Sequence, residues 1–247
     1  MFSNQRSANH MSTSFQPLYK QVYDVLNQRL QEGYWKPGDL LPSEFALADE
    51  LGVSQGTVRK ALNQLVTEHL LDRQQGKGTF VAEHTQESSL FRFFRWREPG
   101  GEKLIPETTV ISQSRKSANA DQQAKLGLPS GAEVNELVRV RSLLDQITLL
   151  EFVVQPLSVF PDIDLVKELP NSLYTLYQER YGISIISARD ELRAEALPKK
   201  FAKHLNLTPQ HPVLVVERLS INIDGRAVEY STAYCSTESF SYVVNLK

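Results

Sequence analysis

Residues 41–81, LPSEFALADELGVSQGTVRKALNQLVTEHLLDRQQGKGTFV, decide the fold of the N-terminal part of the chain. A helix is predicted to open at Ser43, because a serine hydroxyl can cap the free backbone N–H groups of a first turn. It ends at Gly52, since glycine readily takes the left-handed conformation just past a helix. Ser54 then caps a second helix that runs to about His69. The stretch therefore predicts two helices that meet at a tight Gly-Val-Ser corner.

The second helix has one apolar and one polar face. Its apolar residues recur at the helical spacing of a buried stripe, namely Val58, Ala61, Leu62, Leu65 and Val66. The other face carries long or hydroxylic side chains without a carboxylate before Glu68, namely Gln55, Thr57, Arg59, Lys60, Asn63 and Gln64. A helix of this shape fits the major groove of DNA, with its first residues at base edges and phosphates.

Two short strands are expected after this helix, at residues 71–75 and 79–82, on either side of Gly76-Lys77-Gly78. The glycines allow close backbone approach, and Lys77 offers a positive charge to phosphate or to the minor groove. Helix, corner, helix and wing together predict a winged helix-turn-helix. A small helical hairpin with a solvated polar face is the alternative, which the agreement of spacing, capping and wing disfavours.

The same stretch resembles the GntR family of bacterial transcription regulators. The family signature consists of PLYxQV, PGxxLPSE, TVRxAL and GxGTFV, and all four motifs occur between Pro17 and Val81. Two residues depart from the family pattern, since Phe45 and Gln55 stand where arginine is usual. Glutamine suits adenine whereas arginine suits guanine, so the operator sequence stays open. We expect DNA contacts from the helix start and the wing, namely Ser54, Gln55, Thr57, Arg59, Lys60, Gly76, Lys77 and Gly78.

Composition favours a two-domain protein of the reducing cytoplasm. The chain has 247 residues, of which 41% are hydrophobic, enough for a real core. Its single cysteine, Cys235, excludes an internal disulfide framework and is expected to be a buried strand thiol. No apolar run has the length of a membrane span, and the N-terminus lacks a signal-peptide core. The net charge is −2 and the basic excess is confined to residues 54–82, so we expect binding by a dimer at modest salt.

The flanks of the DNA-binding domain, which spans residues 15–82, are polar. Residues 1–14 lack periodicity and are expected to be disordered, with Met11 as a possible native start. A first amphipathic helix is marked by Leu18, Val22, Val25, Leu26 and Leu30. Residues 83–98 are expected to form a linker, and its aromatic and basic part, LFRFFRW at 90–96, indicates core or interdomain packing. A lid over a ligand and a nucleic-acid face are the alternatives for that part.

From about residue 105 the pattern changes to α+β. Strands are predicted at 108–113, 133–144, 147–155, 184–196, 213–223, 227–234 and 240–246, and helices at 118–126, 171–181 and 198–205. Turns are expected at Asp145-Gln146 and Asp224-Gly225. The segment 99–247 resembles the UTRA effector domain of the HutC subfamily, which implies a mixed or antiparallel sheet with helices, of the chorismate-lyase type. The motifs that carry this resemblance are VRVR at 138–141, Glu151, Phe160-Pro161 and DGxxVEY at 224–230.

Two arginines in this domain are candidates for an effector site. Arg139 and Arg141 lie two residues apart on a strand, so both side chains project from one face. Glu151 is expected nearly opposite Arg141, where a cross-strand ion pair can form. Such a group is either a surface ladder or a pocket in which guanidinium groups bind carboxylate or phosphate. The UTRA resemblance implies the pocket, with Glu229 and Tyr234 as further effector contacts.

One motif suggests an enzyme instead. Residues 52–56 match G-x-S-x-G, the nucleophile elbow of α/β-hydrolases, and Asp190, His204 and His211 follow in Ser-Asp-His order. The elbow requires a strand before the serine, whereas a helix is expected there, so a serine hydrolase is the weaker alternative. The histidines show no metal-ligand spacing, and a lyase-like fold does not by itself carry lyase chemistry. We therefore expect no enzyme, no cofactor and no metal.

Together the two resemblances imply a ligand-responsive transcriptional regulator, a repressor of a metabolic operon. It is expected to bind a near-palindromic operator duplex as a homodimer in the bacterial cytoplasm, at the nucleoid when on DNA and without contact with a membrane. A small anionic metabolite at Arg139 and Arg141 is expected to reorient the DNA-binding domains through residues 91–96. The motifs leave open the identity of the effector, the operator sequence and the direction of the ligand effect.

Overall fold

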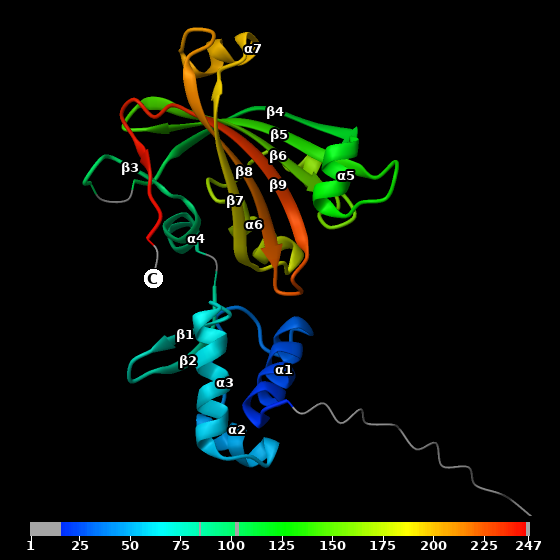
Figure 1. Cartoon of the computed structure of the whole chain (residues 1–247). Coiled ribbons are helices and arrows are strands. Elements are labelled where there is room, and N and C mark those ends of the chain that lie inside the picture. The colour runs from blue at the N-terminus through cyan, green and yellow to red at the C-terminus, as the bar shows by residue number, and fades with distance from the viewer. Residues whose placement is uncertain (1–15, 84, 102–103, 246–247) are drawn as a thin grey trace, which may run out of the picture. The chain divides into compact units, whose positions relative to one another are not determined.

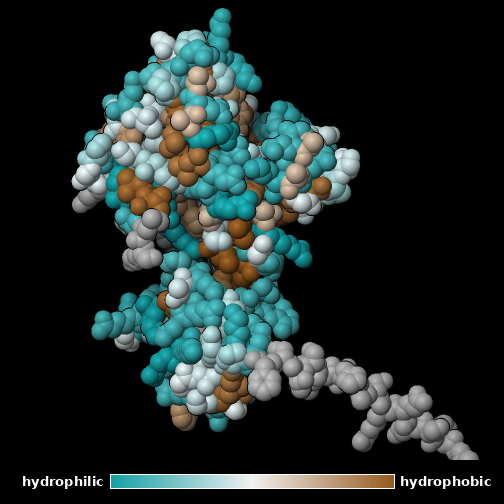
Figure 2. Space-filling model, viewed as in Figure 1, coloured by the Kyte–Doolittle hydropathy of each residue, from teal (hydrophilic) through white to brown (hydrophobic). Residues whose placement is uncertain are grey.

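The computed structural model describes residues 16–83, 85–101 and 104–245 (Figure 1). The chain divides into two compact units, Met1–Val81 and Ala82–Lys247. The expected disorder of residues 1–14 lies outside the described residues. No helix in the described ranges combines the length and the apolarity that crossing a bilayer requires. On the face seen in Figure 2 both units are mainly hydrophilic, with hydrophobic residues in scattered patches.

The described part of the N-terminal unit contains a helical bundle followed by a hairpin. Its elements are α1 Leu18–Gln31, α2 Glu44–Leu51, α3 Gln55–Thr67, β1 Leu71–Gln74 and β2 Gly78–Val81. Helix α1 packs on α3 through a narrow stripe of buried residues, Val22, Leu26 and Leu30. Leu18 and Val25 are exposed, so the expectation that they belong to this stripe is wrong. A helix with one main neighbour buries one row of side chains at i, i+4 spacing. Val25 lies beside that row, and Leu18 continues it at the first residue of the helix, where it is left exposed.

The two predicted serine caps are confirmed. The Ser43 hydroxyl accepts a hydrogen bond from the backbone N–H of Ala46 at 3.1 Å, and Ser54 does the same for Thr57 at 3.2 Å. Gly52 ends α2 with φ of 64°, a conformation that other residues adopt at a cost. The corner between α2 and α3 is therefore held by capping at both helix starts and by one glycine.

The second unit is built on a six-stranded antiparallel sheet in the order β4-β5-β6-β9-β8-β7 (Figure 1). Its strands are β4 Glu107–Ser117, β5 Glu133–Leu143, β6 Gln146–Pro156, β7 Ile185–Ala196, β8 Pro212–Asn222 and β9 Ala227–Cys235. Among the described residues that follow β4, the helices are α5 Ala120–Leu126, α6 Leu173–Tyr181 and α7 Lys199–Ala202. Short 3-10 turns lie at Ile163–Leu165 and Lys203–Leu205. The predicted α+β class is confirmed.

The sheet packs a hydrophobic core on each face. On one face α6 places Leu173 and Tyr177 against Leu137 and Val153. On the other face Leu150 and Val215 pack against the segment that contains α7, with Leu197, Ala202 and Leu205 buried there. Because side chains alternate between faces along each strand, residues of one parity on β5, β6 and β9 reach the α6 side. Cys235 lies on β9 as a buried free thiol, as expected.

The segment predicted to be a linker, residues 83–98, is instead part of the second unit. It contains helix α4 Gln86–Phe93 and strand β3 Trp96–Arg97, and β3 pairs with β10 Ser241–Tyr242. Thr85 caps α4, with Ser88 completing a capping box. Leu90, Phe93, Phe94 and Trp96 are buried in the cores of this unit, which agrees with the packing expected for the aromatic residues. The side chain of Phe91 lies outside the described residues.

The hairpin between β5 and β6 turns one residue earlier than predicted. Its central residues are Leu144 and Asp145, with φ of 46° and 63°, whereas Asp145-Gln146 was the expected turn. A two-residue turn with positive φ at both positions matches the twist of the paired strands. The earlier turn and a bulge after Arg141 bring Glu151 opposite Arg139. The expectation that Glu151 lies opposite Arg141 is therefore wrong.

Candidate functional site

The polar side of α3 faces solvent. Gln55, Arg59, Lys60 and Asn63 are exposed, and Thr57 is half-buried. Opposite them, the predicted apolar stripe lies in the core, with only Val66 half-buried. The helix therefore presents the donors that the sequence assigns to DNA, and its start is fixed by the Ser54 cap.

Glu44 organises this surface. Its carboxylate accepts hydrogen bonds from Arg59 Nε at 2.8 Å and from Arg73 Nη2 at 3.1 Å, with Gln55 Nε2 at 3.4 Å. One carboxylate thus holds residues from α3 and β1 in a fixed array, which lowers the ordering cost when they meet a ligand. The sequence pattern singled out neither Glu44 nor Arg73 as site residues, because their meeting depends on the packing of α2 against α3 and β1.

Lys60 and Ser54 make contacts within the N-terminal unit. The Lys60 ammonium lies 4.0 Å from the centre of the Tyr19 ring, a cation–π contact with α1. The Ser54 hydroxyl is 2.9 Å from the Thr57 hydroxyl, besides capping the helix. Ser54 therefore acts first on the structure of α3, whereas Gln55, Arg59 and Lys60 are exposed to solvent and are held by Glu44 and Tyr19.

The wing depends on two glycines around Lys77. Gly76 has φ of 75° and Gly78 has φ of 128°, both outside the range that other residues prefer. A Cβ on Gly78 would lie 2.5 Å from Leu40 Cδ1, because Leu40 bridges to Phe80 beside the hairpin. Lys77 is exposed at the turn between them. The geometry therefore places the lysine at the tip of a closely packed hairpin.

Phe45, one of the two departures from the GntR signature, is 74% exposed at the start of α2. It follows Glu44 in the chain, next to the carboxylate that holds Arg59 and Arg73. A large exposed apolar side chain beside a basic array adds no phosphate contact, but it can meet a thymine methyl group.

The nucleophile elbow that would support a serine hydrolase is not formed. Ser54 follows helix α2 and a turn, rather than a strand, and its hydroxyl caps α3. Asp190, the acid in the alternative, forms a two-point ion pair with Arg218. In the ranges that the structure describes, no group of three or more His, Cys, Asp and Glu side chains is arranged for a metal ion.

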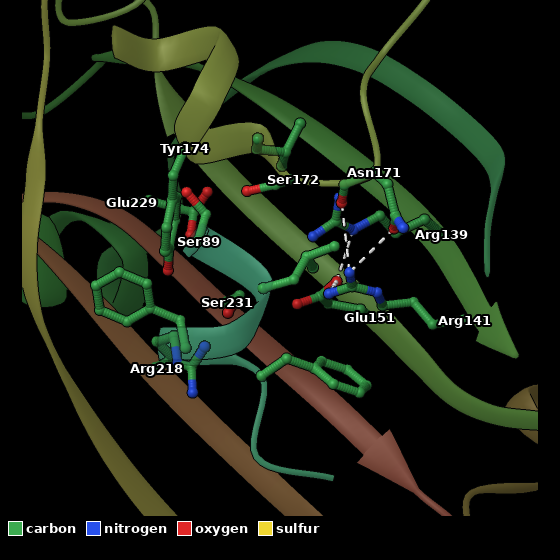
Figure 3. Close-up of a pocket in the computed structure, with 14 residues that line it drawn as sticks. Ser89, Arg139, Arg141, Glu151, Asn171, Ser172, Tyr174, Arg218, Glu229 and Ser231 are labelled. Carbon is green, nitrogen blue, oxygen red and sulfur yellow. Dashed lines mark hydrogen bonds and ion pairs between the residues drawn. The ribbon is translucent and has the colours of Figure 1, made fainter. Parts of the chain in front are cut away.

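Arg139, Arg141, Glu151 and Glu229 come together in one pocket of the second unit. Figure 3 shows the two arginines and Glu151 on one side of it and Glu229 with Tyr174 on the other. All but Glu151 are buried, and Glu151 is half-buried. These residues therefore line a pocket and do not form a surface ladder, and anion binding there stays a prediction. The remaining polar lining consists of Ser89, Asn171, Ser172, Arg218 and Ser231.

The ion pairs in this pocket are unevenly distributed. Glu151 accepts a hydrogen bond from Arg139 Nε at 2.6 Å, while its distance to Arg141 Nη1 is 4.0 Å. Burial would raise the pKa of Glu151, but the charges of Arg139 and Arg141 hold it below the ordinary value. Arg218 has its own partner, since Asp190 binds it at 2.6 Å through both carboxylate oxygens. Arg141 is thus the arginine of the pocket without a carboxylate of its own.

Arg141 is held by neutral groups instead. Its Nη2 donates to the backbone oxygen of Asn171 at 3.3 Å and to the side-chain oxygen at 3.2 Å, and its guanidinium lies 4.9 Å from the centre of the Phe94 ring. Burial and the neighbouring charge of Arg139 lower the pKa of Arg141 to about 9. The protein therefore keeps a buried cation that its own groups compensate only in part.

Three buried polar atoms that line this pocket have no hydrogen-bond partner within the described protein. They are Ser89 Oγ, Arg139 Nη1 and Arg141 Nε. Unsatisfied buried donors are costly, so their gathering at one place indicates a site that a polar ligand completes. Ser89 belongs to α4, in the segment that the sequence predicts as a linker, which is why the sequence pattern does not reveal it.

Glu229 closes the far side of the pocket. It accepts hydrogen bonds from Ser220 Oγ at 2.8 Å and from the Tyr177 hydroxyl. Burial raises its pKa above the ordinary value, against the lowering effect of the hydrogen bonds from Tyr177 and Ser220 and of the Arg139 charge. The group can therefore accept from the hydroxyl of a ligand or, when protonated, donate to it.

Tyr234, the remaining predicted effector residue, does not line this pocket. It lies on the opposite face of the sheet, where its ring packs 4.9 Å from Phe201 and 6.2 Å from Phe152 between centres. Those rings border a separate open groove of about 320 Å³. Arg218, Asn171 and Tyr174 also line the pocket. They come from β8, from the segment before α6 and from α6 itself, and the sequence does not reveal how these distant segments pack together.

A winged helix-turn-helix surface and a charged ligand pocket in a second unit define a DNA-binding regulator with an effector domain. Comparison with known families agrees with both parts. Residues 18–81 match the bacterial regulatory proteins of the gntR family, and residues 101–241 match the UTRA domain. The chain therefore belongs to the GntR family of transcriptional regulators, with the UTRA domain of the HutC subfamily.

Related regulators cover almost the whole chain. The mannosyl-D-glycerate transport/metabolism system repressor MngR of Escherichia coli is 30% identical over 92% of this chain and 95% of its own length. The transcriptional repressor NagR of Bacillus subtilis is 27% identical over 92% and 93%. Among solved structures, PhnF from Mycobacterium smegmatis has a TM-score of 0.55 at 23% identity, covering 92% of this chain and 99% of that one. The protein is a ligand-responsive, DNA-binding transcriptional regulator.

Proposed function

We propose that this regulator is a homodimeric repressor that a small, anionic, sugar-derived metabolite releases from its operator. The anionic character rests on one observation, a pocket with three unsatisfied polar atoms, one of which belongs to the incompletely compensated Arg141. The sugar character is taken from relatives, among them repressors for mannosyl-D-glycerate metabolism and, by their names, for fructoselysine utilization. We also propose that the regulator acts in the cytoplasm and has no catalytic activity of its own.

Charge balance favours an anion at Arg141. A buried cation that shares its only nearby counter-ion costs free energy, and a carboxylate or phosphate of a ligand would offset this cost with two-point hydrogen bonds. Arg139 already shares Glu151 and Arg218 already shares Asp190. Glu229 and Ser231 would then accept hydrogen bonds from hydroxyl groups of the same ligand or donate hydrogen bonds to them. The pocket thus offers one anion position and several hydroxyl positions.

The space in the pocket links binding to helix α4. The free volume is about 40 Å³, enough for water but too small for a sugar derivative. Leu90, Phe93 and Phe94 from α4 and its end fill the remainder. A ligand would therefore displace side chains of α4, which follows the wing after only Ala82 to Thr85 in the chain. An arrangement that binds the ligand and one that binds DNA would then exclude each other, which is what coupling requires.

The test replaces Arg141. We expect Arg141→Ala to retain operator binding in a gel-shift titration and to lose release by sugar acids and sugar phosphates, tested as a panel. Arg226→Ala, at an exposed hairpin turn of the same unit, is the matched control and should respond as the parent does. Mass spectrometry of the purified protein would identify a retained ligand. Normal release of the Arg141 variant by an anionic sugar, or release of the parent by neutral sugars alone, would contradict the anion site.

The operator contacts are part of the same proposal. We assign base and phosphate contacts to Gln55, Thr57 and Arg59 and phosphate or minor-groove contacts to Lys60 and Lys77. The exposure of Gln55, Arg59, Lys60 and Lys77 and the array around Glu44 support this assignment. Two such surfaces, one from each subunit of a dimer, would meet a near-palindromic operator.

A further inference from the structure

Strand β7 stands at one edge of the six-stranded sheet, with β8 as its partner on one side only among the described strands (Figure 1). Its register with β8 shifts once, between Ile185 and Ser187, and is then regular up to Ala196. An edge strand presents a row of backbone N–H and C=O groups that another strand can pair with. A regular exposed edge of this length therefore requires an explanation.

The opposite edge of the sheet is protected and serves as a comparison. Strand β4 carries a bulge between Val110 and Ser112, in the middle of its pairing with β5. Bulges bend and twist a strand and so prevent a second sheet from adding to it. The irregularity of β7 lies at its first residues instead, which leaves the rest of the edge suitable for pairing.

The outward charges of β7 alternate in sign. Residues 189–195 read RDELRAE, and Arg189, Glu191, Arg193 and Glu195 project from one face. Arg189 and Glu191 have side chains that are 63% and 55% exposed. Charges on an edge usually keep other chains away. Here their order makes the edge complementary to itself in one register.

Symmetry limits the possible registers. Two copies of β7 can pair antiparallel about a two-fold axis normal to the sheet, and residues that lie opposite each other then point to the same face. Because opposite residues must have the same parity in the sequence, the axis passes midway between the two copies of a single residue. With the axis at Leu192, Arg189 lies opposite Glu195 and Glu191 lies opposite Arg193, in both copies. With the axis at Glu191 or Arg193, residues of like charge lie opposite each other. With the axis at Asp190 or at Ala194, one kind of opposite-charge pair forms, Arg189 with Glu191 or Arg193 with Glu195. The register centred on Leu192 forms two kinds and is therefore the one that the charges favour most.

The other face of β7 fits the same register. Leu192, a large apolar residue that is 46% exposed, would pack against Leu192 of the second copy. On either side of it, Asp190 would lie opposite Ala194 and Ala188 opposite Ala196. Asp190 is held inward by Arg218 at 2.6 Å, and the alanines leave room. The Tyr242 hydroxyl of β10 also donates to Asp190, so this carboxylate is already paired within one copy and brings no unpaired charge to the register.

We propose that β7 pairs with β7 of a second copy of this chain, antiparallel and centred on Leu192, so that two six-stranded sheets become one. This inference rests on the proposed homodimer and names its interface. Exposed ion pairs contribute little to affinity, and Arg193 already contacts Glu217 at 2.6 Å. The backbone hydrogen bonds and the burial of Leu192 therefore provide the affinity, while the charges determine the register.

A cysteine placed on the axis tests this geometry directly. In the proposed dimer the Cβ atoms of the two residues 192 lie about 4.5–5.5 Å apart, close enough for a disulfide after a small shift. The natural thiol, Cys235, is buried and does not interfere. We expect Leu192→Cys to form a disulfide-linked dimer under mild oxidation in dilute protein. Ile111→Cys on the β4 edge, where the parent side chain is 41% exposed, is the matched control and should stay unlinked.

Charge reversal tests the register. Glu191→Arg brings like charges together across the axis and should weaken dimerisation at least about 10-fold, measured by light scattering over a dilution series. Within one copy the new arginine lies opposite Glu217, so the variant keeps its fold, which circular dichroism checks. Exchange of both charges, Glu191→Arg with Arg193→Glu, should restore the dimer.

The outcomes separate this interface from the homodimer itself. A dimer that persists in Glu191→Arg, together with no disulfide in Leu192→Cys, would overturn the β7 interface and leave the homodimer intact. A parent protein that is monomeric at micromolar concentration would overturn both. A dimer that dissociates in Glu191→Arg, returns on charge exchange and is cross-linked through residue 192 would establish the interface.

Discussion

At the scale of single residues, Arg59 is the most direct test of the DNA-binding surface. It projects from the exposed side of α3 and its Nε lies 2.8 Å from Glu44. We expect Arg59→Ala to lower operator affinity by about 1–3 kcal/mol, the usual loss of one specific arginine contact. Fluorescence anisotropy with labelled operator measures it. The half-exposed side chain makes no core contact, so the unfolding midpoint should not move; an unchanged affinity would remove Arg59 from the interface.

The two carboxylates of the pocket predict opposite dependences on pH. The raised pKa of Glu229 means that the folded protein binds this proton more tightly than the unfolded chain does. Its contribution to stability is therefore present at low pH and lost as pH rises through the folded pKa. We expect Glu229→Gln to raise the urea midpoint more at about pH 8 than at about pH 5, since the amide cannot ionise.

Glu151 is the matched control for that prediction. Its pKa is lowered by Arg139 and Arg141, so its contribution is present above the unfolded value and lost as pH falls through the folded one. Glu151→Gln should therefore lower the urea midpoint, and more at about pH 8 than at about pH 3, where the carboxyl of the unfolded chain is protonated. Equal shifts of Glu229→Gln at about pH 5 and 8, and of Glu151→Gln at about pH 3 and 8, would show that neither carboxyl titrates differently in the folded state.

The residues of the pocket show what a strand pattern can and cannot reveal. Arg139 and Arg141 were placed correctly, because alternation along one strand depends only on local geometry. The same rule excludes Tyr234, which is an odd number of residues from Glu229 on the same strand and so faces the other way. Asn171 and Arg218 reach the pocket through packing between distant segments. Such contacts depend on the register of several strands, which one sequence does not determine.

At the scale of secondary-structure elements, the wing depends on the contact between Gly78 and Leu40. A side chain at residue 78 meets both an unfavourable φ of 128° and a Leu40 methyl group at 2.5 Å. We expect Gly78→Ala to lower the free energy of unfolding by about 1–3 kcal/mol through this strain. Because Leu40→Ala opens the space, the double variant should lose less than the sum of the two changes.

Urea unfolding followed by the fluorescence of Trp35 measures these changes, in a Trp96→Phe background. Gly76→Asn is the control, since this position has open space around it and asparagine tolerates its φ of 75°. That change should stay within about 0.5 kcal/mol. Additive losses in the Gly78 and Leu40 cycle would mean that backbone strain alone, and not the contact, makes glycine necessary.

The elements with local signals were predictable and those without were not. Serine caps and a terminal glycine mark α2 and α3 within a residue, because capping is a local interaction. Helix α4 was not predicted from the sequence. Its capping box is formed by Thr85 and Ser88, and it lies in a polar segment followed by aromatic residues, a pattern that is typical of a linker. The strand expected at 240–246 shrinks to Ser241–Tyr242, because it pairs only with the short β3.

At the scale of the whole molecule, the two units are joined by a very short connection. Helix α4 starts after Thr85 and the wing ends at Val81, so only Ala82 to Thr85 lie between them. Four extended residues span at most about 14 Å. In the proposed function a ligand displaces α4, and the short connection then limits how far the DNA-binding unit can lie from that helix. This is how a pocket in one unit could control a surface in the other.

The same short connection predicts how the dimer measures its operator. Lengthening the centre of the operator by about 10 base pairs shifts one half-site by about 34 Å while keeping it on the same side of the duplex. Two connections of about 14 Å each cannot make up this distance. We therefore expect insertions of 5 and of 10 base pairs to reduce affinity alike, to that of an isolated half-site, because neither lets both α3 helices bind. The Glu191→Arg variant, whose subunits should separate in the proposed dimer, should bind the original operator and both lengthened operators with that half-site affinity. Recovery of affinity on the 10-base-pair insertion would show that α4 detaches on DNA and lengthens the connection.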